Sequence, residues 1–324
     1  MQNPKPFFRN LTLSLLVSLI FNSPLPLDSS AARAADSQTA TATLPSATDP
    51  QIKTFDIAHL SWLPQTKSRN QLVLFLPGTN GVPRSDFGFT KTAAALGFHT
   101  IFLMYPDGIA AQQCCVNRDD PDAYIKFRTA IIEGGFYSDQ VNITRPDSIE
   151  NRLQKLLSYL DKHQPKQGWG QYLDKSGQIN WKQIVVCGHS QGGGHAYMIS
   201  KYHQVARVIC FSSPKDYSHY FRAPAKGFDN KTKTPLNRYF AFNHLQDKIG
   251  THEEQMEIFK SIGLTREGMI EVNDPQSDYK HARLIFTNLA VIGSPKTAAH
   301  GSVLRDIYPL CPSVWKYMLT EPVQ

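Results

Sequence analysis

The sequence lacks the motifs that mark several large classes of enzyme. It contains no P-loop, no GxGxxG opening a helix and no HExxH, and the fragment HEEQM at 252–256 has no second histidine. Its five cysteines form no CxxC pair and no His/Cys spacing typical of zinc. No motif therefore indicates a nucleotide-binding, dinucleotide-binding or zinc enzyme, and we expect no cofactor and no metal.

A dense block of lysine and arginine is also missing, although the chain is basic. The formal net charge is +7, from 34 basic and 27 acidic residues. A mild excess without interleaved aromatics gives no reason to expect nucleic-acid binding. It is compatible with weak attraction to anionic cell-wall or membrane surfaces.

Long apolar runs are scarce, and the one that stands out lies near the N-terminus. Residues 11–21, LTLSLLVSLIF, carry no charge, and they follow Lys5 and Arg9. The small-residue sequence ARA stands at 32–34. This order predicts a cleaved signal peptide over 1–34, because the apolar run is shorter than the roughly 20 residues of a membrane-spanning helix. We expect a secreted or periplasmic protein with no transmembrane span in the mature chain; an uncleaved anchor is the alternative.

After the signal peptide, the small polar stretch 35–51 is typical of a flexible linker. In the remaining domain, 52–324, short apolar runs alternate with helical patterns. The expected strands are 71–77, 99–106, 182–188, 206–212, 237–244 and 282–288. The expected helices are 86–98, 145–165, 191–203 and 251–263. This alternation predicts an α/β fold with a mainly parallel central sheet flanked by helices.

Two irregular stretches, 105–145 and 213–236, interrupt the alternation. Long excursions of this kind often form lids or binding loops. Aromatic residues occur in both, including Tyr124, Phe127 and Phe136. They could cover a site as an apolar lid or pack the excursions onto the domain.

The five cysteines lie in two kinds of sequence. Cys187 and Cys210 stand in apolar strand-like runs, so we expect buried free thiols there. Cys114, Cys115 and Cys311 stand in loop-like sequence. Export would permit a bridge from the adjacent pair to Cys311, with the connectivity left open.

A glycine-rich turn carries the strongest chemical signal. GHSQG at 188–192 follows the apolar run IVVC and precedes a helical pattern. In G-x-S-x-G the serine sits on a strained strand-to-helix turn, and the glycines avoid collisions with the neighbouring strand and helix. A turn packed only for shape is the alternative, but the strand–turn–helix setting favours Ser190 as a nucleophile.

With this GHSQGG elbow and its element order, the sequence over most of 52–320 resembles the α/β-hydrolase superfamily, and within it serine esterases and lipases. The resemblance implies the chain order nucleophile, acid, histidine. It thereby implies Ser190 as nucleophile, Asp247 as acid and His300 as base. Asp216 is the alternative acid, and His281 is the alternative histidine.

The same resemblance implies an oxyanion hole made of two backbone N–H groups. Gln191 supplies one, and the loop FLPGTNG at 75–81 supplies the other from Thr79, with Asn80 as the alternative. Pro77 stands where the HGGG lipases have histidine, so the chain departs from that branch.

The function implied is an exported serine hydrolase that cleaves a small-molecule or lipid-like carboxylic ester through an acyl-enzyme. A catalytically silent hydrolase-like binding protein is the alternative. A faint S-x-x-K pattern, Ser212 to Lys215, echoes penicillin-recognising serine enzymes. Its companion SDQ at 138–140 comes too early in the chain, and Pro214 would interrupt the helix that should carry the pair.

Overall fold

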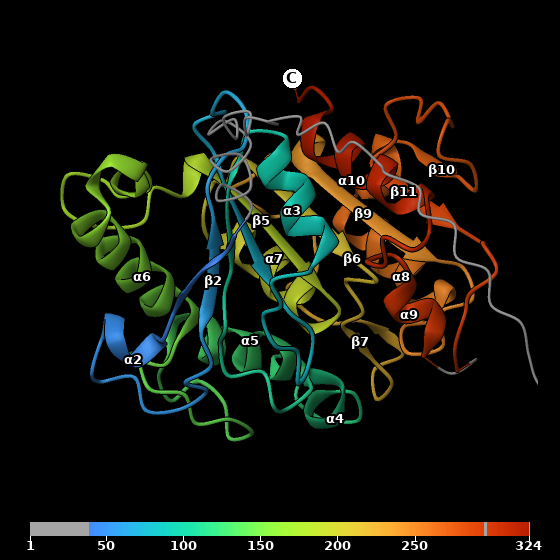
Figure 1. Ribbon diagram of the computed structural model, residues 1–324. Coiled ribbons are helices and arrows are strands. Elements are labelled where there is room, and N and C mark those ends of the chain that lie inside the picture. Colours follow the sequence, from blue (N-terminus) through green and yellow to red (C-terminus); the bar gives the residue numbers. More distant parts are fainter. Residues whose placement is uncertain (1–38, 295–296, 324) are drawn as a thin grey trace, which may run out of the picture.

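A nine-stranded sheet forms the centre of the computed structural model, which describes residues 39–294 and 297–323 (Figure 1). The strand order is β1-β2-β4-β3-β5-β6-β9-β11-β10. The strands are β1 Thr41–Thr43, β2 His59–Trp62, β3 Leu72–Leu76, β4 His99–Phe102, β5 Ile184–His189, β6 Arg207–Phe211, β9 Tyr239–His244, β10 Met269–Glu271 and β11 Leu284–Thr287. The strand β2 pairs antiparallel with both β1 and β4, and the strands from β4 to β10 in this order pair parallel to one another.

Helices cover both faces of this sheet (Figure 1). They are α2 Pro45–Thr48, α3 Gly88–Ala95, α4 Ala111–Cys115, α5 Ala123–Glu133, α6 Ile149–His163, α7 Gln191–Tyr202, α8 His252–Ile262, α9 Ala298–Ser302 and α10 Leu310–Thr320. A two-stranded ribbon, β7 Tyr217–Ser218 with β8 Ala223–Pro224, stands apart from the sheet. The predicted α/β class is confirmed, and the mainly parallel sheet agrees with the α/β-hydrolase fold that the resemblance implies.

Alternation along the strands builds two apolar cores. In β3, Leu72, Leu74 and Leu76 belong to the core that includes residues of α5, α6, α7 and α8, whereas Val73 and Phe75 belong to the core that includes residues of α3 and α10. Successive strand residues point to opposite faces, and a parallel sheet covered on both faces buries both sets. This is why the expected strands appeared as continuous apolar runs in the sequence.

The expected disulfide from the adjacent cysteine pair to Cys311 is wrong. All five cysteines are free thiols. Cys115 packs in the core beside α5 and α6, whereas Cys311 packs in the core beside α3, on the other face of the sheet. The sheet therefore separates the thiols that the bridge would have to join.

Two expectations about the N-terminal side of the chain have different outcomes. The expected signal peptide, 1–34, lies outside the described residues. We expected a linker over 35–51, but Thr41–Thr43 pairs with β2, and Asp49 accepts a hydrogen bond from Asn151 Nδ2 of α6 at 3.2 Å. Hydrogen bonds to the domain therefore hold residues 41–49, whose polar composition is also that of a linker.

The stretch 105–145 is not irregular throughout, because it contains α4 and α5. Tyr124 and Phe127 of α5 are buried in the core, and Phe136 is 96% exposed. The aromatics of this stretch therefore do not form one apolar lid. Within the described ranges, none of the helices has the length and apolar content needed to cross a bilayer.

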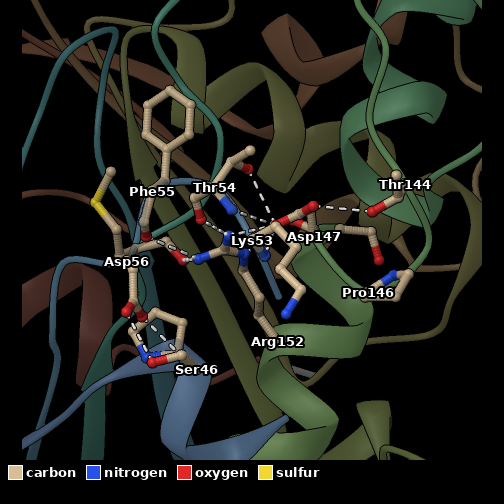
Figure 2. A network of polar contacts seen from close by, with 12 residues as sticks. Ser46, Lys53, Thr54, Phe55, Asp56, Thr144, Pro146, Asp147 and Arg152 are labelled. Atoms are coloured by element: carbon tan, nitrogen blue, oxygen red, sulfur yellow. Dashed lines mark hydrogen bonds and ion pairs between the residues drawn. The ribbon is translucent and has the colours of Figure 1, made fainter. Parts of the chain in front are cut away.

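A buried arginine ties the N-terminal segment to α6 and to the end of β4. Figure 2 shows Arg152 reaching from α6 towards the backbone of Thr54 and Phe55. Its guanidinium pairs with Asp147 at 3.0 Å and also donates to the Met104 carbonyl at 3.4 Å. Asp147 in turn accepts from the Thr54 N–H and hydroxyl at 3.1 and 3.0 Å.

We expect Arg152→Met to lower the free energy of unfolding by about 3–5 kcal/mol, because it leaves a buried carboxylate and several carbonyls without their partner. Urea denaturation followed by circular dichroism measures the loss. Lys162→Met, on the exposed face of the same helix, is the control and should change stability by less than about 0.5 kcal/mol. Equal effects of the two substitutions would contradict the structural role of Arg152.

Candidate active site

Ser190 sits between β5 and α7 on a backbone that few non-glycine residues adopt. Its φ is 53° and its ψ is −115°. A Cβ on Gly192 would lie 2.1 Å from the Leu76 carbonyl oxygen, and one on Gly188 would lie 2.2 Å from the Gly192 carbonyl carbon. Contacts this short with backbone atoms leave no space for a side chain. The two glycines thus allow the turn that presents Ser190 beyond the end of β5.

Ser190 and three other segments meet at one edge of the sheet, because parallel strands end at the same edge. Ser190 follows β5, the loop 77–81 follows β3, Lys215 follows β6 and Asp247 follows β9. A pocket of about 440 Å³ opens there. It is lined by Gly78, Thr79, Gly81, Ala110, Gln112, Gln113, His189, Ser190, Lys215, Ile249 and His300. Ser190 and His300 therefore face one cavity.

Asp247 and His300 form a short, buried hydrogen bond. His300 Nδ1 lies 2.6 Å from Asp247 Oδ2. The other carboxylate oxygen accepts from the Ile249 and Gly250 amides at 2.8 and 3.3 Å. Burial alone would raise the pKa of Asp247, but the hydrogen bond and charge of His300 and the two amides hold it below its usual value. The ionised carboxylate therefore accepts a hydrogen bond from Nδ1–H, and in the neutral imidazole this tautomer leaves Nε2 as the proton acceptor.

The backbone of His300 is held from two sides. Its carbonyl oxygen accepts from Ser212 Oγ at 2.8 Å and lies 3.0 Å from His189 Nε2. Burial, aided by the charge of His300, lowers the pKa of His189 to about 3. The neutral His189 thus donates from Nε2 to His300, and it forms a wall of the pocket.

In the loop after β3, the N–H groups of Gly78 and Thr79 have no acceptor among the described residues, whereas those of Asn80 and Gly81 do. The Asn80 N–H donates to the Asp107 carbonyl at 3.2 Å. The Gly81 N–H donates to the Gly78 carbonyl at 2.8 Å and to Asp107 Oδ2 at 3.1 Å. The Thr79 N–H has no acceptor in the described part of the chain. This pattern favours Thr79 over Asn80 as the second oxyanion donor.

The Gln191 side chain links three segments around the pocket. Its Oε1 accepts from the Ala111 N–H at 2.9 Å and from Thr79 Oγ1 at 3.3 Å, and its Nε2 donates to the Ile109 carbonyl at 2.9 Å. Its own N–H belongs to the first turn of α7, where no intrahelical acceptor exists. The side chain thus keeps the two expected oxyanion donors at fixed positions.

Asp216, the alternative acid, is engaged elsewhere. Both of its oxygens bind Arg128 of α5, at 2.7 and 2.8 Å, in a fully buried ion pair. Arg128 also donates to the Gln191 carbonyl at 2.9 Å, and a Cβ on Gly194 would lie 2.2 Å from its guanidinium. The ion pair therefore holds the first turn of α7 in place through the contacts of Arg128 with Gln191 and Gly194. Sequence reasoning missed Arg128, which is one of two basic residues, with Lys126, in the otherwise largely apolar run AYIKFRTAII.

His281 and the residues of the S-x-x-K pattern make contacts that do not suit a catalytic base or nucleophile. His281 is exposed, and its Nδ1 contacts Glu321 Oε1. Ser212 is buried, and its hydroxyl is engaged with the His300 carbonyl. Lys215, the last residue of the S-x-x-K pattern, lines the same pocket as Ser190. Ser212 does not line this pocket, and the two residues do not form the helical pair that their pattern requires.

Comparisons with known proteins find distant structural likenesses only. No protein-family model matches the chain, and no curated protein does. An α/β serine hydrolase homologue from Coxiella burnetii is 11% identical at a TM-score of 0.42, over 86% of this chain and 95% of its own. A thermophilic esterase from the Planctomycetes species Thermogutta terrifontis is 11% identical at 0.45, over 87% and 89%. An α/β serine hydrolase from Xanthomonas campestris is 10% identical at 0.40, over 88% and 97%.

Asp107 stands out among the groups that hold the loop after β3. Its side chain is fully buried, and Oδ1 has no hydrogen-bond partner among the described residues. Burial raises the pKa of Asp107 to about 7, even though the Gly81 N–H binds the carboxylate. The folded protein thus holds a proton here that the unfolded chain loses near the ordinary value of 3.8.

Because the pKa of Asp107 is higher in the folded state, its contribution to stability is complete below about pH 4 and is lost as the pH rises towards 7. The slope is at most about 1.4 kcal/mol per pH unit. We expect Asp107→Asn, which cannot ionise, to remove this loss. The free energy of unfolding of the variant, relative to that of the wild type, should therefore rise by roughly 3–4 kcal/mol between pH 4.5 and 7.5. Urea denaturation at a series of pH values measures both proteins. Parallel stability curves would show that Asp107 does not titrate in this range.

Proposed function

We propose that this protein is a serine hydrolase that cleaves a carboxylic ester through an acyl-enzyme on Ser190. The observation that carries the proposal is the 2.6 Å hydrogen bond between Asp247 and His300 at the pocket that Ser190 also lines. A serine on a strained turn, a buried imidazole and an ionised carboxylate are the groups that acyl transfer needs. The same residues were expected from the sequence.

In the proposed mechanism, the Ser190 hydroxyl attacks the ester carbonyl while His300 Nε2 takes its proton. Asp247 holds the imidazole with Nδ1 protonated and stabilises the imidazolium that forms. The N–H groups of Thr79 and Gln191 bind the oxyanion of the tetrahedral intermediate. His300 then protonates the leaving alcohol, and in the second half-reaction it activates the water that releases the acid.

The positions of the supporting groups suit this sequence of steps. The Ser212 hydroxyl and the His189 ring fix the carbonyl of His300, which limits movement of its ring relative to Ser190. Arg128 and the Gln191 side chain fix the first turn of α7. A site whose groups are held before the substrate arrives needs little reorganisation during the reaction, which is the main source of electrostatic catalysis.

We further propose that the protein acts outside the cytoplasm, either secreted or in a periplasm. The support is the order of charge, apolar run and small residues over 1–34 in the sequence. The mild positive charge would keep such a protein close to anionic envelope surfaces. Its substrate would then be an ester present in that compartment.

We expect Ser190→Ala and His300→Ala each to lower kcat for p-nitrophenyl acetate by about 10⁴- to 10⁶-fold, because residues that act as a unit fail together. Asp247→Asn should cost about 10⁴-fold, because the amide favours the wrong imidazole tautomer. Release of p-nitrophenol, followed by its absorbance, measures all three variants.

Ser158→Ala, on the exposed face of α6, is the matched control and should keep the activity of the wild type. Circular dichroism shows whether each variant is folded. Folded Ser190→Ala with wild-type turnover would contradict the assignment. No turnover of any ester by the folded wild type would favour the alternative of a hydrolase-like binding protein.

A further inference from the structure

One charged group at the pocket has no role in the proposed mechanism. Lys215 follows β6 and lines the same pocket as Ser190 and His300, and only 6% of its surface is exposed. Its ammonium makes no hydrogen bond or ion pair in the described part of the chain. Lysine is almost never buried to this degree without a partner, because desolvation of its charge is costly.

The ammonium of Lys215 has not been withdrawn from solvent completely. Although the residue as a whole is buried, Nζ is not one of the described polar atoms that lack both solvent contact and a hydrogen-bond partner. Since the residue lines the pocket, the accessible part of its side chain opens there. Burial lowers the pKa of Lys215 to about 8, with the charges of Asp216 and Asp247 opposing the decrease and that of Arg128 adding to it. The amine is therefore mostly protonated at pH 7.

The surroundings of Lys215 are built around its side chain. Gly250 leaves room for the aliphatic stem, since a Cβ there would lie 2.9 Å from Lys215 Cβ and 3.1 Å from Cδ. Gln112 Nε2 donates to the Lys215 carbonyl at 2.9 Å and fixes the backbone. The two carboxylates whose charges act on Lys215 are already engaged, Asp216 with Arg128 and Asp247 with His300.

The pocket contains no side chain that would neutralise the ammonium. Among the described residues that line it, none is aspartate or glutamate. A second pocket of about 350 Å³ shares Gly78, Gly81 and His189 with the first. It is lined by Arg84 and Arg305, again without a described aspartate or glutamate. The two pockets together thus carry basic side chains and no described carboxylate, which favours an anionic ligand over a cationic one.

We propose that Lys215 binds an anionic group of the substrate, so that the preferred substrate is an ester carrying a carboxylate a few bonds from the scissile bond. This inference rests on the proposed function, because it assigns a substrate class to the same site. A carboxylate would give the buried ammonium the charge-assisted hydrogen bond that it lacks. Lys215 is then a specificity-determining residue and takes no part in the proton transfers.

The test compares two pairs of esters in which one member carries a carboxylate and the other carries a neutral group at the same position. Mono-p-nitrophenyl adipate and p-nitrophenyl hexanoate differ by a carboxylate in place of the terminal methyl group of the acyl chain. The ester p-hexanoyloxybenzoate and its neutral analogue p-hexanoyloxybenzamide carry the difference on the alcohol. The pair that shows the preference identifies the side of the ester that contacts Lys215.

In at least one pair, we expect the wild type to favour the anionic ester in kcat/KM by roughly 10- to 100-fold, the range of a charge-assisted hydrogen bond. Lys215→Met should abolish this preference through a higher KM for the anionic ester. Lys182→Met, which removes an exposed lysine at the opposite end of β5, should keep the preference. An equal loss on both members of each pair in Lys215→Met would show a catalytic or structural role and overturn the inference.

A measurement on the wild type alone decides the matter if Lys215→Met does not fold. Free adipate should inhibit hydrolysis of p-nitrophenyl hexanoate competitively at concentrations at least about 10-fold lower than the diol of the same chain length. Equal inhibition, or hydrolysis of the neutral esters with no preference for either anionic one, overturns the inference and leaves the proposed function standing. Hydrolysis of none of the four esters overturns the proposed function and the inference with it.

Discussion

The lack of space for side chains at positions 188 and 192 is the constraint on which the rest of the site depends. A Cβ would lie 2.2 Å from a backbone atom at Gly188 and 2.1 Å from one at Gly192. The contact brings the start of α7 against the end of β3, which sets Ser190 beside the loop that carries Thr79. Any larger residue would separate the two segments and the donors that they present.

Two buried ion pairs hold α7 and the segment after β4, and Asp107 of that segment binds the loop after β3. Arg128 with Asp216 supports α7, and Arg152 with Asp147 supports the segment after β4 that carries Asp107. Buried pairs of this kind add little net stability, because desolvation offsets their attraction. Their effect here is on position, since Arg128 also binds the Gln191 carbonyl at the start of α7, and Arg152 binds the Met104 carbonyl in the segment that carries Asp107.

The sequence predicted the features that arise from local patterns. Continuous apolar runs revealed the parallel strands, and the motif around Ser190 predicted a strained turn, because both depend on residues close in the chain. Contacts between distant residues were not predictable in this way. Arg128 and Asp216 are 88 positions apart, and nothing near Lys215 in the chain indicates the pocket that it lines. The disulfide was wrong for the same reason, because only the topology places Cys115 and Cys311 on opposite faces of the sheet.

The central claim is that Ser190 is a nucleophile activated by its surroundings. Reaction of the folded protein with a fluorophosphonate, followed by proteolysis and mass spectrometry of the peptides, tests this claim most directly. The account predicts a stoichiometric adduct on Ser190 that does not form when the protein is first unfolded in guanidinium chloride. A folded protein that stays unmodified at Ser190, or that is modified only on another residue, would contradict it.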